Sequence, residues 1–360
     1  MPAPAAHDNP PLKRPRTSES EPLPLPSTSG TTQDTGPGLI VRHSEELWFG
    51  DGNVILAARH TGFRVFRSLL ATQSTVFAEI FASSSSGSDP EIFEGCPVVR
   101  VSDTPEDIAH FLRVLLPTSQ RILFSRKFSF SFHQISAIIR LAHKYNVLDI
   151  CNQAIASLQD HFTTDFAAWD RGANEEVIKV RFQQSIGVVN LARLVDRPAL
   201  LPTAFYKCAL LGCDVLAGYR REDKSIEHLS PEDLKRCING RNKLVEEAFA
   251  ILLEVFVSRP CDECTTDVVC RTALQRLLEV ALVSCKQASA SVLQGWDDLI
   301  QECAQEWHLC AACVKTVLER EYQARKRVWD ALPVIFDVKV DGWPSAPRNK
   351  DGDAPASANA

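Results

Sequence analysis

The chain has 360 residues, of which 45% are hydrophobic, and a formal net charge of −6 at pH 7. This length is enough for two domains, whereas the acidic balance argues against binding a nucleic-acid backbone, which requires a basic face. The sequence shows neither an apolar run as long as a membrane span nor the apolar core of a signal peptide. We therefore expect an intracellular protein with no nucleic-acid and no membrane partner.

The two ends of the sequence have the composition of disordered segments. Nine of the 21 prolines precede residue 38, so residues 1–40 lack the apolar content for a core and predict a disordered arm. Residues 341–360 predict a disordered tail. Lys13, Arg14 and Arg16 form a basic cluster that is typical of a nuclear import signal and equally typical of a solvated patch. Nucleus and cytoplasm both stay open.

The folded part of the N-terminal half opens with strand signals. Asn53 to Arg59 and Phe63 to Phe66 are apolar segments on either side of a break at residues 60–62, which predicts a β-hairpin. A helical run follows, with a polar loop over residues 83–90 before a third strand at residues 98–101. Asp103 followed by Glu106 has the spacing of a capping box, so we expect Asp103 to cap the next helix.

Three apolar stripes then indicate helices packed on one face, because their members recur at helical spacing. The stripes are Ile108, Phe111, Leu112 and Leu115; Ile135, Ile138, Ile139 and Ala142; and Leu148, Cys151, Ile155 and Leu158. Strands and helices in this order favour a small sheet flanked by helices.

After residue 170 the pattern is helical. A helical hairpin is predicted over residues 188–211, with Pro198 and Pro202 at its joint. Ser230 followed by Pro231 marks a helix start, with a serine cap and proline at the first position. Long helices are predicted at about residues 242–257, 268–287 and 309–332.

Several of these segments together resemble the fungal, basidiomycete-type family of BTB/POZ domain-containing proteins. In the N-terminal half the resemblance is carried by WFGDGNVILAARHTGFRVF, EGCPVVRVSDTPEDIAHFLRVLL and ISAIIRLAHKYNVLDICNQAI. In the C-terminal half it is carried by LARLVDRPALLPTAFYKCA, LSPEDLKRC, CTTDVVCRTALQRLL, LCAACVKTVLEREYQARKRVWDALPVIF and DGW. It covers about residues 45–343.

The resemblance implies an α+β chain, with a BTB/POZ domain at residues 45–165 followed by an all-α domain at residues 170–340. BTB domains bind proteins and catalyse no reaction, so it implies a protein-protein interaction module that self-associates, as a homodimer, and recruits protein partners. The alternatives are a substrate adaptor of a cullin ubiquitin ligase, with the cullin on the helices between Pro105 and Leu158, or a transcription-associated nuclear scaffold.

The cysteines of the C-terminal half indicate a metal site. Cys264 and Cys270 precede the pair Cys310 and Cys313 by about forty residues, and a helical hairpin would bring them to one tetrahedral zinc ion. The same four positions match the cysteine pattern of the resembling family. Cys261 is an alternative ligand. Because Cys310 and Cys313 also lie on an apolar helix face, small buried core side chains are the competing interpretation.

Catalytic signatures are missing from the sequence, which favours a binding protein over an enzyme. His110, His133, His143 and His161 each stand alone among helix-forming residues, where packed or half-exposed side chains are the usual outcome. Residues 49–53, FGDGN, precede a strand, whereas a phosphate-binding loop opens a helix; a turn is expected there. An enzyme would instead require a cleft with converging titratable groups.

Overall fold

The computed structural model describes residues 40, 42–83, 91–116, 130–172, 178–285 and 290–343. Almost all of the predicted N-terminal arm, its basic cluster, most of the polar loop and most of the C-terminal tail lie outside the described residues. Within them, the protein has a mixed α/β fold with one five-stranded sheet and many helices.

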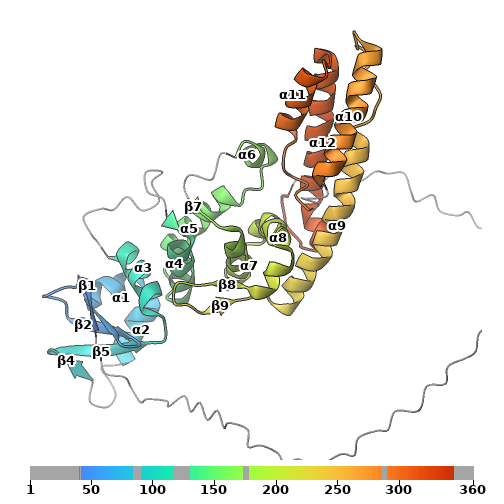
Figure 1. The fold of residues 1–360 in the computed structure, drawn as a ribbon. Helices are drawn as coiled ribbons and strands as arrows, with labels where there is room; N and C mark the ends of the chain where they lie inside the picture. Colours follow the sequence, from blue (N-terminus) through green and yellow to red (C-terminus); the bar gives the residue numbers. More distant parts are fainter. Residues whose placement is uncertain are drawn as a thin grey trace, which may run out of the picture. The chain divides into compact units, whose positions relative to one another are not determined.

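The sheet has the strand order β1-β3-β2-β5-β4 (Figure 1). Its strands are β1 (Arg42–Trp48), β2 (Val54–Ala58), β3 (Thr61–Val65), β4 (Ile92–Phe93) and β5 (Cys96–Val101). The predicted hairpin is confirmed, because β2 and β3 pair antiparallel. β5 pairs parallel with β2, as β1 does with β3. The predicted turn at FGDGN is also confirmed, since the Gly52 amide donates to the Phe49 carbonyl at 3.0 Å.

The break in the hairpin lies earlier than predicted. The turn is formed by Arg59 and His60, with Arg59 at a positive φ of 50°, whereas Thr61 and Gly62 already pair within β3. A Cβ atom at Gly62 would lie 3.0 Å from the Ile40 side chain and 3.2 Å from that of Trp48. This glycine therefore serves close packing inside the strand and not the turn.

The helices of the N-terminal half follow the predicted stripes. They are α1 (Arg67–Gln73), α2 (Thr75–Ser83), α3 (Pro105–Leu115), α4 (Phe132–Lys144) and α5 (Leu148–His161). All stripe residues are buried except Leu148, which is 61% exposed. Leu148 is the first residue of α5, and the buried part of this stripe begins one turn later at Cys151.

The predicted cap of α3 is wrong by one residue. Thr104 is the N-cap, and its hydroxyl accepts the Asp107 amide at 3.2 Å. Asp103 instead accepts from the Lys144 ammonium at 2.7 Å and from the Tyr145 hydroxyl at 2.5 Å. Pro105 fixes the first helical position, and this places the capping oxygen one residue before it.

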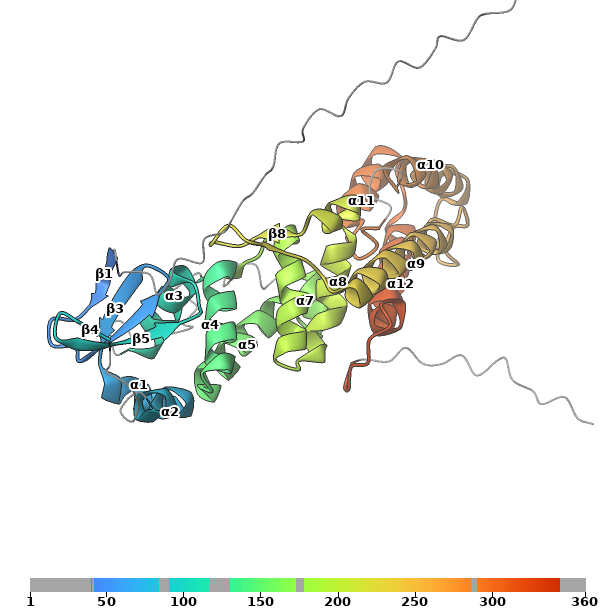
Figure 2. The same cartoon turned by 90° about the horizontal axis from the view of Figure 1, so that it is seen from below.

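The C-terminal half is predominantly helical, as predicted. Among the described residues its α-helices are α6 (Phe166–Asp170), α7 (Ser185–Leu194), α8 (Leu201–Ala209), α9 (Pro231–Val255), α10 (Asp267–Cys285), α11 (Asp297–Glu306) and α12 (Ala311–Ile335). Three short 3-10 helices join them, at Phe182–Gln184, Pro198–Leu200 and Gly212–Ala217. The Ser230 cap of α9 is confirmed by its bond to the Asp233 amide. Figures 1 and 2 show α9 and α12 side by side.

The expectation of a purely helical C-terminal half needs one correction. Two-residue strands occur in it: β7 (Ile178–Lys179), which pairs with β6 (Phe130–Ser131), and the hairpin of β8 (Tyr219–Arg220) with β9 (Ile226–Glu227). Such short strands carry too few residues to leave a period-2 pattern that a sequence analysis could detect.

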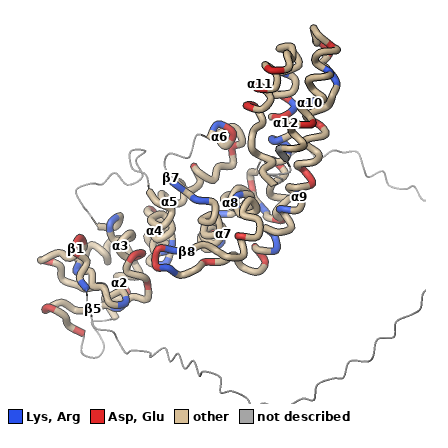
Figure 3. Tube along the Cα trace, viewed as in Figure 1, with Lys and Arg blue, Asp and Glu red and all other residues tan. Residues whose placement is uncertain are grey.

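The β8–β9 hairpin makes polar contacts to the N-terminal half, and charges of both signs gather along it (Figure 3). These contacts join Arg221 to Asp107, Glu222 to His110, Asp223 to Arg59 and Glu227 to Arg140. Three of these four pairs are 2.6 to 2.7 Å long. They fix the hairpin against α3, α4 and the β2–β3 turn.

One cluster of buried side chains continues from Leu47 to Trp343, through sheet and helices. A second, smaller cluster lies on the other face of the sheet, as the alternation along β2 requires: Leu56 joins the large cluster, and Ile55 and Ala57 join the small one. No helix among the described residues is long and apolar enough to cross a membrane.

Candidate metal centre

Two of the candidate ligands lie at the start of α10. The segment before that helix is irregular, as its polar composition predicts, and it turns where the Cys264 amide donates to the Cys261 carbonyl at 3.1 Å. Thr266 directly precedes α10, and its carbonyl accepts the Cys270 amide at 2.9 Å. Cys264 thus lies in the loop and Cys270 in the first turn of α10.

The other two ligands lie at the start of α12. Cys310 is the N-cap residue, with an extended backbone, and its carbonyl accepts the Val314 amide at 3.1 Å. Cys313 lies in the first turn of the helix. A spacing of three residues across a helix start turns both sulfurs to one side.

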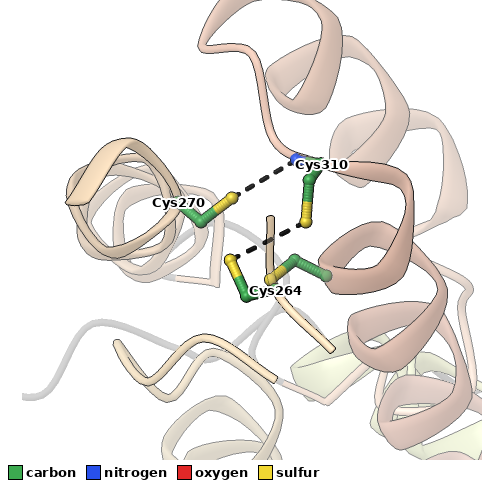
Figure 4. A group of neighbouring side chains, drawn as sticks. Cys264, Cys270 and Cys310 are labelled. Atoms are coloured by element: carbon green, nitrogen blue, oxygen red, sulfur yellow. Dashed lines mark hydrogen bonds between the residues drawn. The ribbon is translucent and has the colours of Figure 1, made fainter. Parts of the chain in front are cut away.

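The structure brings all four predicted sulfurs together. The Sγ atoms of Cys264, Cys270, Cys310 and Cys313 lie within 4.8 Å of one another. Figure 4 shows the Cys264 and Cys310 sulfurs facing each other, with Cys270 approaching from α10. The Sγ atoms of Cys264 and Cys310 are 3.8 Å apart, and the Cys310 amide donates to the Cys270 sulfur at 3.3 Å.

These separations are close to those of a tetrahedral thiolate site. Metal–sulfur bonds of about 2.3 Å place the four sulfurs about 3.8 Å apart. The largest separation in the cluster, up to 4.8 Å, exceeds this tetrahedral value by about 1 Å. The four cysteines could hold a metal ion with no coordination position left for water.

Burial differs between the four side chains. Cys270 and Cys313 are fully buried, whereas Cys264 and Cys310 are half-buried. An ion at the centre would thus be enclosed by the two helices on one side and by the loop on the other. Core packing alone does not require the two half-buried sulfurs to turn toward the buried pair.

Backbone amides beside the cluster favour the thiolate form of Cys310. The amides of Thr265 and then Cys313 donate to the Cys310 sulfur, which lowers the pKa of Cys310 to about 6. Burial acts in the opposite direction on Cys313 and raises its pKa. A bound cation would offset that effect, because it favours the deprotonated form of every ligand. The N-termini of α10 and α12 contribute partial positive charge at the same place.

The alternative ligand Cys261 lies beside the cluster and not within it. Its sulfur is 3.6 Å from that of Cys313, and its side chain is half-buried. The sulfurs of the four predicted cysteines therefore form one group, and Cys261 contacts that group at Cys313.

Two further groups were not apparent from the sequence. Arg325 and Glu321 form a buried ion pair that the exposed Asp170 joins from the surface, and Lys207 lies 2.9 Å from the ring of His161 at a cavity of about 280 Å³. The pairing of Arg325 with Glu321 follows helical spacing of four residues, which a search for such pairs would have found. Asp170 and Lys207 reach their partners across long sequence separations that leave no local signal.

No protein family model, curated protein or solved structure matches this chain.

Proposed function

We propose that this protein is a non-catalytic protein-binding module of the BTB/POZ kind whose C-terminal helices are held together by a structural zinc ion. The metal assignment rests on the four neighbouring cysteine sulfurs, which together can fill every position of a tetrahedral ion. Sulfur donors in tetrahedral arrangement select zinc among the common divalent ions, and a set of four protein ligands is typical of a structural site.

The ion would join elements that have limited contact otherwise. α10 buries a single face, through Cys270, Ala273, Leu274, Leu277 and Ala281, while Val268 and Val283 are largely exposed. Zinc at the four sulfurs would link the first turn of α10 to the first turn of α12. Binding free energy of this kind adds directly to the stability of the folded state.

Metal analysis of the purified full-length protein tests this assignment. We expect about one zinc per chain in the wild type and a large loss of zinc in Cys310→Ser, because three thiolates leave the ion incompletely ligated. Cys213→Ser is the matched control, since Cys213 is exposed and lies outside the cluster. Wild-type protein purified without zinc, and unable to bind added zinc, would contradict the proposal.

Self-association is supported by the second face of the sheet. Ile40, Ile55, Ala57 and Cys96 are buried there, and Trp48, Phe93 and Val98 pack on them while remaining partly exposed. Trp48 also stacks on the exposed His43 ring at a centroid distance of 3.9 Å. A second copy presents the same apolar patch by two-fold symmetry, so this face fits a homodimer.

The mass of the protein in solution, measured by light scattering, tests the dimer. Val98 and Val101 are both half-buried residues of β5 that face opposite sides of the sheet. We expect a dimer for the wild type, a monomer for Val98→Glu and a dimer for Val101→Glu, with folding of each variant verified by circular dichroism. A wild type that is monomeric at micromolar concentration would refute self-association.

The cullin-adaptor alternative places a partner on α3, α4 and α5. Two α3 side chains on that face are already engaged within the chain, since Asp107 binds Arg221 and His110 binds Glu222 of the β8–β9 hairpin. We therefore favour self-association through the sheet over recruitment through α3.

A further inference from the structure

Cys261 is the fifth cysteine of this region, and its position differs from that of the four metal ligands. Its sulfur lies 3.6 Å from the Cys313 sulfur, although 52 residues separate the two in sequence. Cys261 belongs to the irregular segment before α10, so its backbone is not held by a helical hydrogen-bond ladder. Cys313 is 1% exposed in the first turn of α12.

We propose that Cys261 and Cys313 form a reversible disulfide under peroxide, and that this oxidation expels the metal ion. The Cys261 sulfur attacks one oxygen of hydrogen peroxide, which breaks the O–O bond, gives a sulfenic acid and releases hydroxide. The Cys313 sulfur then attacks the sulfenic sulfur and displaces its oxygen as a second hydroxide, which solvent protonates. In total, two thiols are oxidised and one peroxide is reduced to two waters.

The burial of the two side chains assigns their order of reaction. Cys261 is half-buried and accessible to a small oxidant, whereas Cys313 is enclosed. Disulfide formation requires the sulfurs to approach to about 2.05 Å, a movement of about 1.5 Å that the loop can supply. The pair Cys264 and Cys310 is also close, at 3.8 Å, but both of its sulfurs are ligands of the ion and are less available as nucleophiles when it is bound.

Oxidation would dismantle the metal centre because Cys313 is one of the four ligands. The three sulfurs left cannot complete a tetrahedral closed site. The release of metal rests on the proposed zinc site. Formation of the disulfide does not, because it depends only on the contact between Cys261 and Cys313.

The experiment treats full-length zinc-loaded protein with hydrogen peroxide. Released zinc is followed with a chromogenic chelator, and disulfides are mapped by mass spectrometry of peptides prepared at acidic pH. We expect a Cys261–Cys313 disulfide and zinc release that a thiol reductant with added zinc reverses. Zinc release from Cys261→Ser should be slower by about tenfold, since the accessible thiol is missing. Cys213→Ser should behave as the wild type.

The possible results separate this inference from the zinc assignment. If the protein binds no zinc, peptide mapping on the metal-free chain still decides whether Cys261 and Cys313 join. A Cys264–Cys310 disulfide in place of the proposed one would overturn the inference, as would equal rates of zinc release from the wild type and Cys261→Ser. If the protein binds one zinc per chain and gives either of these results, the structural zinc site is supported and the disulfide inference is rejected.

Discussion

At the scale of single residues, Arg325 is a buried cation that is paired with a buried carboxylate. Its guanidinium is 1% exposed and donates to both oxygens of Glu321, at 2.5 and 2.8 Å, and to Asp170. Glu321 is fully buried and also accepts the Trp296 amide at 3.1 Å. Burial raises the pKa of Glu321, and the bonds from Arg325 oppose that rise. The positive charge of Arg325 therefore offsets the cost of burying the Glu321 carboxylate.

We expect Arg325→Ala to lower the free energy of unfolding by about 3 to 5 kcal/mol, because it leaves that buried carboxylate without its cation. Arg327→Ala is the control from the same helix. Arg327 and its partner Glu254 are both nearly half exposed, and such surface pairs contribute at most about 1 kcal/mol. Urea unfolding of the three proteins measures the difference. Equal losses in the two variants would show that the buried cluster contributes no more than a surface pair.

At the scale of secondary-structure elements, helix starts determine much of the arrangement. α3, α4 and α9 each begin with a hydroxyl side chain that accepts an amide of the first turn. α12 begins instead with Cys310, which carries a thiol and not a hydroxyl at this position. Its sulfur lies 3.8 Å from that of Cys264, so the residue at the start of this helix belongs to the four-cysteine cluster.

The cap of α3 gives a prediction that tests the contribution of the Thr104 hydroxyl. Thr104→Ala should lower the free energy of unfolding by about 1 kcal/mol, because the Asp107 amide loses its acceptor. Thr104→Ser should retain most of that stability, since serine keeps the hydroxyl. Thermal or urea unfolding of both variants provides the measurement. A neutral Thr104→Ala variant would mean that water replaces the hydroxyl without cost.

At the scale of the whole molecule, the continuity of the core bears on cooperativity. The main cluster of buried side chains includes Leu47 of the sheet and Trp343 near the end of the described chain. The β8–β9 hairpin adds ion pairs between the two halves. A core shared in this way couples the unfolding of its parts.

We therefore expect the zinc-loaded protein to show a single unfolding transition by calorimetry, because the shared core couples its parts. After chelation of the metal, the transition should move to lower temperature. Two separated transitions in the loaded protein would show that the halves unfold independently despite the shared cluster.

Local patterns in the sequence were sufficient for much of this structure. The apolar stripes of α3, α4 and α5, the strands β2, β3 and β5, and the Ser230 cap all follow from interactions within a few residues of the chain. The four cysteines that could hold a metal ion were also predicted from their spacing and type. Such features are decided by side-chain periodicity and by backbone geometry, which each segment carries with it.

Other features depend on residues that are distant in sequence. The parallel pairing of β1 with β3, the role of Asp103 as a partner of Lys144 and not as a cap, and the meeting of Asp170 with Arg325 have no local signature. The type and spacing of the cysteines were enough to predict which of them could form a metal site. The position of Cys261 outside that set and beside Cys313 depends on the tertiary structure, because these two residues are 52 positions apart and meet only when the chain folds.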